Sequence, residues 1–381
     1  METILRKIAL FLRQRSEQKQ EIDLLRQFEE WRLLLQQFPE HKSSALKLAI
    51  VRLDDIGDYL LFRNFLSAYK TSEQFKEYKI TLIGNIVWKP IFEAYDANAV
   101  DATIWLDKNK YHSELEYRMS FWQQIRAENF ETIICPSRTR PLLLDDSIAL
   151  ASGAKNKIAC HNSFAFADWN KVSDRIYTTL FPANLELHEF FFNKDFAQKI
   201  SAKTLTIDKP FLPESDNTIV HPMQVLCFIG ASAKSKTWPL NNWIELLQLL
   251  QQNGYEPLLS GGKNEMEIAA QIIAAIPVKS IAGQTNLTET LLAIANSTAV
   301  ITGDTMAAHA SVSFNKPTVI LANGVNAKRF VAYEEAGFKN VKTVYTRQYT
   351  NSKKDTFYRA VTKDMESIKP KQILEALQKI V

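Results

Sequence analysis

The chain has 381 residues, a length that predicts two domains, and its 46% hydrophobic and 23% charged residues exclude a disordered or fibrous protein. The formal net charge of +4 suits an anionic small ligand or a membrane surface. We expect no nucleic-acid partner, because such proteins concentrate basic residues on one face. The three cysteines, Cys135, Cys160 and Cys227, form no C-x-x-C pair, so a reducing cytoplasm without structural metal is the simplest interpretation.

Residues 1–43 are predicted to be a helical extension, because apolar residues such as Ile4, Ile8 and Phe11 recur at helical spacing and Pro39 closes the segment. A helix or helix pair packed on the body is slightly favoured over a basic amphipathic helix on anionic lipid, since acidic residues dilute the basic first turns. No apolar run reaches the ~18 residues of a membrane span, and a signal-peptide pattern is absent. The expected location is cytoplasmic. If the N-terminal helix lies on anionic lipid, the protein is expected at the inner face of the cytoplasmic membrane.

Residues 44–205 alternate short apolar runs with helix-length segments, which predicts a parallel sheet covered by helices on both faces. The predicted strands are 46–53, 80–84, 102–106, 131–137 and 157–161. Helical periodicity follows in 58–70, 113–130 and 188–201.

Residues 206–222 hold Pro210, Pro213 and Pro222 and are predicted to be a linker. The same alternation then resumes over 223–365, and 366–381 are expected to form a C-terminal helix. Two such domains form a cleft at the C-terminal ends of their strands, where ligands bind in open α/β folds. The predicted strands of the second domain are 224–230, 256–262, 279–283, 299–304 and 317–324.

The first candidate motif, Arg52-Leu-Asp-Asp-Ile-Gly-Asp58, directly follows a strand. Gly57 allows a tight turn, and Asp58 lies where the next helix begins. From the spacing alone Asp58 is favoured as a helix N-cap. A general base is the alternative, because a carboxylate at a strand end faces the cleft.

The second motif runs from Gly230 to Pro239 and reads Gly-Ala-Ser-Ala-Lys-Ser-Lys-Thr-Trp-Pro. Hydroxyl groups, lysines and backbone amides entering a helix suit a phosphate, and a solvated loop anchored by Trp238 is an equally good interpretation. The sequence contains neither G-x-x-x-x-G-K-[ST] nor G-x-G-x-x-G, which argues against a P-loop ATPase and a fingerprint dehydrogenase.

Two further motifs follow strands of the second domain. In Thr302-Gly-Asp-Thr-Met-Ala-Ala-His309, Asp304 and Thr305 can cap a helix whose free amides would face a phosphate. His309 follows one turn later, although a lone histidine is more often structural. In Ser260-Gly-Gly-Lys-Asn-Glu265, the glutamate could accept hydrogen bonds from ribose hydroxyls or interact with the helix dipole.

Taken in order, the motifs Ile-Gly-Asp, Lys-Thr-Trp-Pro, Gly-Gly-x-x-Glu, Gly-x-x-x-Leu-x-Glu and Gly-Asp-Thr-x-x-x-His resemble the family 9 glycosyltransferases, the ADP-heptose:lipopolysaccharide heptosyltransferases, over about residues 46 to 330. The resemblance implies a GT-B fold, with two Rossmann-like domains whose parallel sheets face a central cleft. It implies an inverting, metal-independent glycosyltransferase without a cofactor. The implied partners are a nucleotide-sugar donor such as ADP-heptose and a lipopolysaccharide core or other glycolipid acceptor.

The resemblance also assigns roles to residues, with Asp58 as the general base and Arg52 on the acceptor side. A departure is Met306, where the family usually has glycine. The alternatives are a GT-B-shaped nucleotide-sugar-binding protein without turnover and a nucleotide-sugar epimerase. The residues that the resemblance places at the donor are Ser232, Lys236, Glu265, Asp304, Thr305 and His309.

Overall fold

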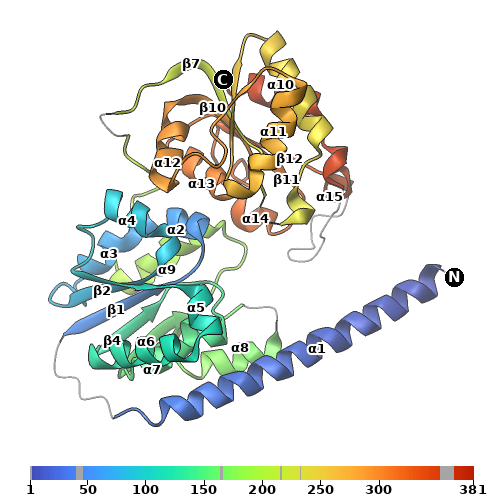
Figure 1. Cartoon of the computed structure of the whole chain (residues 1–381). Coiled ribbons are helices and arrows are strands. Elements are labelled where there is room, and N and C mark those ends of the chain that lie inside the picture. The colour runs from blue at the N-terminus through green and yellow to red at the C-terminus, as the bar shows by residue number, and fades with distance from the viewer. Residues whose placement is uncertain (1, 40–45, 164–165, 215–216, 232, 352–363) are drawn as a thin grey trace.

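The computed structural model describes residues 2–39, 46–163, 166–214, 217–231, 233–351 and 364–381. Figure 1 shows two α/β halves, with a long N-terminal helix lying along the first and extending past it. In each half a six-stranded sheet carries helices on its faces. The predicted α/β architecture with two parallel sheets is therefore confirmed.

The first sheet has the strand order β3-β2-β1-β4-β5-β6, and all its pairs are parallel. Its central strands, nearest to β1, are buried on both faces. In β1, Leu48 and Ile50 join one apolar cluster, whereas Ala49 and Val51 join another on the opposite face. The strands are β1 (Lys47–Arg52), β2 (Lys79–Asn85), β3 (Ala102–Leu106), β4 (Thr132–Cys135), β5 (Asn156–Cys160) and β6 (Thr179–Phe181). The α-helices of this half are α2 (Ile56–Phe62), α3 (Leu66–Lys70), α4 (Lys89–Tyr95), α5 (Lys108–Ser113), α6 (Leu115–Ala127), α7 (Ser147–Ala151), α8 (Ala167–Asp174) and α9 (Glu189–Ser201).

The second sheet has the order β12-β11-β10-β7-β8-β9 and repeats the topology of the first. In both sheets the order reverses between the first and fourth strands, β1 and β4 or β7 and β10, and ligands bind at such a switch point. The strands are β7 (His221–Phe228), β8 (Glu256–Ser260), β9 (Lys279–Ser280), β10 (Ser297–Gly303), β11 (Thr318–Ala322) and β12 (Val341–Tyr345). The α-helices are α10 (Leu240–Gln252), α11 (Met266–Ala275), α12 (Leu287–Asn296), α13 (Met306–Ser313), α14 (Ala327–Phe330), α15 (Arg347–Asn351) and α16 (Pro370–Gln378).

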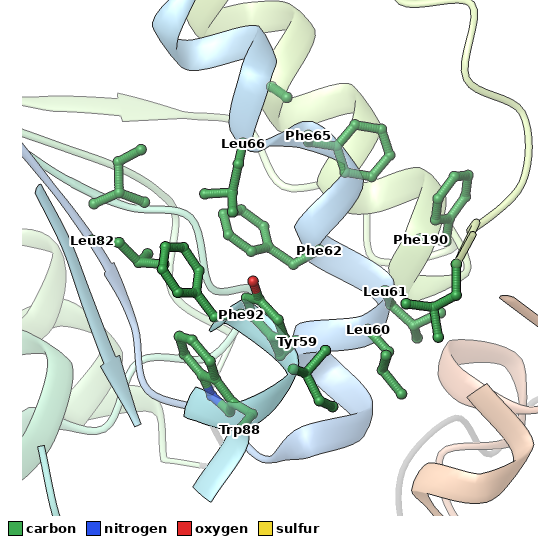
Figure 2. Close-up of a cluster of buried hydrophobic side chains, with 14 of the residues drawn as sticks. Tyr59, Leu60, Leu61, Phe62, Phe65, Leu66, Leu82, Trp88, Phe92 and Phe190 are labelled. Atoms are coloured by element: carbon green, nitrogen blue, oxygen red, sulfur yellow. The ribbon is translucent and has the colours of Figure 1, made fainter. Parts of the chain in front are cut away.

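The two halves share one apolar core around α2. Figure 2 shows Tyr59 lying face to face with Trp88, and their ring centroids are 4.0 Å apart. The same cluster includes Leu291 of α12 and Ala307 of α13, so it continues into the second half. This continuity holds the strand ends of the two sheets against each other. The proposed domain limits, with a linker over 206–222, stay a prediction.

The N-terminal segment is one helix, α1 (Glu2–Leu35), and its C-terminal portion packs on the first half. Trp31 is buried there and makes edge contacts with Tyr111 and Trp122, while the Arg118 guanidinium lies 4.1 Å from the Trp31 ring centroid. The favoured interpretation, a helix packed on the body, is thus confirmed for this portion. Among the helices of the described residues, none has the length and apolar character needed to span a membrane.

Candidate functional site

Two adjoining cavities open at the switch points of the sheets. The larger, of about 720 Å³, lies between the halves, and the smaller, of about 220 Å³, lies mainly against the first half. Asp55, Asp58 and Phe330 line both cavities. The first half contributes Asp55, Ile56, Gly57, Asp58 and Val87 to the larger cavity, and the second contributes Phe228, Gly230, Ala231, Lys236, Gly261, Gly262, Glu265, Thr285, Asn286, Leu287, Thr290, Asp304, Thr305, Met306, His309, Asn326 and Phe330.

Asp58 lies in the first turn of α2, at the junction of the two cavities. It is not the N-cap that the spacing favoured, because Asp55 occupies that position and makes no side-chain cap hydrogen bond. The Asp58 side chain is 20% exposed, and its Oδ1 lies 4.0 Å from Nη2 of Arg329. Its carboxylate is therefore free to face a ligand.

The surroundings of Asp58 favour its protonated form. Burial and the nearby Asp54 carboxylate raise the pKa of Asp58 to about 7, although the cations of Arg329 and Arg52 oppose that rise. A carboxylate with a pKa near neutrality can accept a proton in one step of a reaction and release it in another. This tuning is typical of a general base.

A buried ion cluster lies behind Asp58 and joins the two halves. Glu189, the first residue of α9, is fully buried and accepts a hydrogen bond of 2.7 Å from Nε of Arg329. Nε of Arg138 lies 3.3 Å from Glu189, and Nη2 of Arg52 lies 3.7 Å from it. Burial alone would raise the pKa of Glu189, but these three arginines lower it to about 2. The carboxylate therefore stays ionised.

Cationic and amide groups gather on the second-half wall of the larger cavity. Lys236 Nζ lies 2.6 Å from Oδ2 of Asp304, which holds the ammonium group at the cavity. Thr305 is the N-cap of α13, and its hydroxyl accepts a hydrogen bond from the Ala307 amide. Because the amides at a helix N-terminus attract anions, this wall can hold a phosphate group.

Glu265 packs against two glycines of the neighbouring strand ends. A Cβ on Gly230 would lie 2.6 Å from the Glu265 carboxyl carbon, and a Cβ on Gly261 would lie 2.7 Å from its Cβ. Glu265 Oε2 also accepts a hydrogen bond from the Gly262 amide. Its carboxylate thus stabilises the turn before α11, and the residue also lines the cavity. A role at the helix start is therefore compatible with a role in accepting hydrogen bonds from a ribose.

His309 is buried where the halves meet. Its Nδ1 lies 2.7 Å from the Tyr333 hydroxyl, and burial lowers its pKa to about 4, so the ring is neutral near pH 7. A Cβ on Gly57 would lie 2.5 Å from Cδ2 of this ring. Glycine at position 57 therefore permits the close approach of α2 and α13.

The smaller cavity is lined by four carboxylates and two cations. Asp54 and Asp145 both accept from the Ser137 hydroxyl, and Lys108 pairs with Asp55 at 2.6 Å. The other charged residues lining it are Asp58 and Arg329. Within the described parts of the chain, no three histidine, cysteine, aspartate or glutamate side chains are arranged to hold a metal ion.

Residues 118–357 match the family model described as Glycosyltransferase family 9 (heptosyltransferase), which covers more than half of the chain. The chain belongs to glycosyltransferase family 9. Lipooligosaccharide heptosyltransferase 2 of Haemophilus influenzae is 32% identical to it over 93 residues, which are 23% of this chain and 27% of that protein. The chain thus spans less than a third of the length of this curated relative.

Solved structures of family 9 glycosyltransferases share the fold of this chain. The family 9 glycosyltransferase of Veillonella parvula superposes with a TM-score of 0.67 at 15% identity, over 88% of this chain and 96% of that one. The E. coli heptosyltransferase WaaC with ADP gives 0.65 at 16% identity, over 88% of this chain and 100% of the other. The predicted GT-B fold is confirmed.

In this family 9 chain, the structure gathers most residues that the sequence placed at the site. Asp58 and five of the predicted donor residues line the larger cavity, while Ser232 lies outside the described residues. Arg52 lines neither cavity, because its guanidinium is fully buried and pairs with Asp54 at 3.1 Å. The five donor residues at the cavity are Lys236, Glu265, Asp304, Thr305 and His309.

Met306 lines the larger cavity as the first residue of α13. Its backbone does not have the positive φ that favours glycine, so a side chain fits there without strain. Two residues near Asp58, Glu189 and Arg329, had no assigned role in the sequence analysis. The signal for Glu189 is its position beside His188 at the start of a predicted helix; no local motif marks Arg329.

Proposed function

We propose that the chain is an inverting glycosyltransferase that moves a heptose-like sugar from a nucleoside-diphosphate donor to a hydroxyl of a lipopolysaccharide core or another glycolipid. The observation that carries this proposal is the place of Asp58, whose carboxylate faces both cavities at once. A donor in the larger cavity and an acceptor in the smaller one would meet at this group. The names of the family 9 relatives, which include lipooligosaccharide heptosyltransferase 2, support the choice of sugar and acceptor.

The reaction that fits this arrangement is a single displacement. Asp58 takes the proton of the acceptor hydroxyl as its oxygen attacks the anomeric carbon, and the bond from that carbon to the diphosphate breaks. Lys236 and the amide end of α13 stabilise the negative charge on the leaving diphosphate. Since attack comes from the face opposite the leaving group, the anomeric configuration inverts.

The test is a transfer assay with nucleotide-sugar donors, ADP-heptose first, with and without a lipopolysaccharide-core acceptor. The proposal requires nucleoside diphosphate and glycosylated acceptor to appear together, and only when both substrates are present. Release of nucleoside diphosphate without an acceptor would instead support an epimerase-type elimination or hydrolysis. Donor binding without any turnover would support a binding protein.

Lys236→Ala is expected to weaken the binding of a nucleoside diphosphate by about 10- to 100-fold, because a hydrogen bond between charged groups contributes about 1.5–3 kcal/mol. The change also leaves the buried Asp304 without its cation beside the diphosphate. Isothermal titration calorimetry with ADP measures the effect. Lys234→Ala is the matched control, since Lys234 is exposed in the same short turn and does not line the cavity. Equal losses in both variants would contradict a phosphate contact at Lys236.

We also propose that the N-terminal turns of α1 contact an anionic membrane surface that carries the acceptor. The helix extends past the body there, and its sequence has basic residues at positions 6, 7, 13, 15 and 19. Deleting residues 2–15 spares the packed portion around Trp31. The deletion is expected to reduce flotation with vesicles containing anionic lipid but not with neutral vesicles. Unchanged flotation on anionic vesicles would contradict the proposal.

A further inference from the structure

Arg329 reaches the proposed base from the opposite half of the molecule. It lies on α14, which follows β11 of the second sheet, whereas Asp58 and Glu189 belong to the first half. Its Nε donates to Glu189 Oε2 at 2.7 Å, and its Nη2 lies 4.0 Å from Asp58 Oδ1. The residue is 7% exposed, so its charge acts on both carboxylates with little screening by water.

We propose that Arg329 is a positioning residue which the second half brings to Asp58, and that Glu189 fixes its guanidinium there. The base is then complete only while the two halves are closed on each other. This inference rests on the proposed function insofar as it takes Asp58 as the base. It assigns a role to Arg329 and Glu189, to which the sequence motifs assign no role.

The ion cluster is built so that Arg329 can leave without destabilising Glu189. Arg138 and Arg52 both belong to the first half, and both remain beside the Glu189 carboxylate when the halves separate. Arg329 is the partner that only closure adds. A buried carboxylate that lost every partner would be costly, but this one keeps two cations in either arrangement. Separation and closure are therefore both accessible to the cluster.

A second contact beside the ion pair sets the position of α14. His188 precedes Glu189, and its Nε2 lies 3.1 Å from the backbone oxygen of Phe330, which follows Arg329. Burial lowers the pKa of His188 to about 3, so the ring is neutral. Its Nδ1 accepts from the Phe190 amide, which leaves the proton on Nε2 to be donated to Phe330. Two consecutive residues of one half thus hold two consecutive residues of the other.

Four charged groups, from three elements and one loop, act on Asp58. Asp54 lies in the loop after β1, Arg52 lies on β1, Glu189 lies on α9 and Arg329 lies on α14. The two carboxylates raise the pKa of Asp58, and the two arginines lower it. Of these four groups, Arg329 is supplied by the second half. The Arg329 charge that closure brings therefore favours the ionised base and opposes the burial that raises the pKa of Asp58.

The experiment compares the pH profiles of transfer for the wild type, R329Q, R329K and K328Q. The wild-type rate is expected to rise through a pH near 7, where Asp58 ionises. In R329Q this acidic limb moves upward by about one unit or more, the size of shift that loss of an opposite charge within ~4–6 Å produces. R329K keeps the charge and is expected to restore most of the shift.

K328Q is the matched control because it removes a cation from the same helix. Lys328 pairs across the halves with Glu186 at 3.6 Å, yet it lines neither cavity. Its pH profile is expected to coincide with that of the wild type. R329Q should fold, since Glu189 keeps Arg138 and Arg52, and a thermal melt verifies this. If R329Q does not fold, the maximal rates of R329K and K328Q are compared instead. The single ammonium group of the new lysine in R329K is expected to lower the maximal rate below that of K328Q.

A second readout needs no turnover. Asp58 lines the larger cavity, so ADP affinity is expected to fall as Asp58 ionises, and D58N is expected to abolish that step. In R329Q the midpoint of the step moves to higher pH, whether or not the chain transfers sugar. Midpoints that coincide in R329Q and K328Q would overturn the inference. Absence of transfer with a shifted midpoint would overturn the proposed function alone.

Discussion

Asp58→Asn is expected to slow sugar transfer by about 10²- to 10⁴-fold, the range that general acid–base catalysis contributes. Asparagine keeps the size of the side chain, so the cavities keep their shape, but the amide cannot take the proton of the acceptor. The affinity for a nucleoside diphosphate should be retained, because the phosphate-facing groups lie on the other half. Steady-state transfer kinetics together with calorimetry separate the two effects.

Asp55→Asn is the control for this substitution. Asp55 is three residues away, lines both cavities and pairs with Lys108, but its side chain is 79% exposed. An exposed ion pair contributes at most about 1 kcal/mol, so the expected loss is at most about fivefold. Comparable losses in the two variants would remove Asp58 from the role of base.

Asp58→Asn, which lowers activity, is expected to raise the stability of the folded chain. The folded-state pKa of Asp58 is raised from 3.8 to about 7, so the folded chain favours the protonated form. That stabilisation is fully present below the unfolded pKa and is lost as pH rises through about 7. D58N should therefore melt at a higher temperature than the wild type at pH 8, with a smaller difference at pH 4. Equal differences at both pH values would contradict the raised pKa.

The central strands of both sheets are readable from the sequence because they are buried on both faces and so form continuous apolar runs. The run 102–106 became β3 with the same limits. The strands β6 and β12, absent from the sequence analysis, lie at sheet edges, and most of their residues are only half-buried. An edge strand needs less apolar surface, which leaves a weaker pattern in the sequence.

Some residues of the candidate site were also predictable from the sequence, and others were not. The groups at the ends of β1, β7, β8 and β10 were found because parallel topology brings the residues after each strand to one edge of the sheet. The pairing of Glu189 with Arg329 joins positions 140 residues apart, and no local spacing predicts it. Arg52 shows a further limit. A charged residue within an apolar run indicates a buried partner, but the sequence does not identify Asp54 and Glu189 as those partners.

Gly57→Ala is expected to reduce transfer about 100-fold, the loss that a 1 Å misplacement of reacting groups can cause. The added Cβ would lie 2.5 Å from the ring of His309, and buried neighbours leave little room for it to retreat. The Tyr333 hydroxyl holds Nδ1 of that ring, and the Phe330 ring centroid lies 6.0 Å away. Either α2 shifts, moving Asp58 with it, or the halves fail to close.

Gly303→Ala distinguishes this contact from a general cost of replacing glycine. Gly303 ends β10, its backbone lacks a left-handed φ, and the nearest atom to an added Cβ lies 3.9 Å away. That variant is expected to stay within about 0.5 kcal/mol of the wild type in stability, and its transfer rate should be nearly unchanged. Small-angle scattering measures whether Gly57→Ala also expands the molecule. A wild-type transfer rate in Gly57→Ala would mean that turnover does not require the close approach of α2 and α13. A lower transfer rate with unchanged molecular dimensions would mean that the substitution acts by changing the orientation of Asp58.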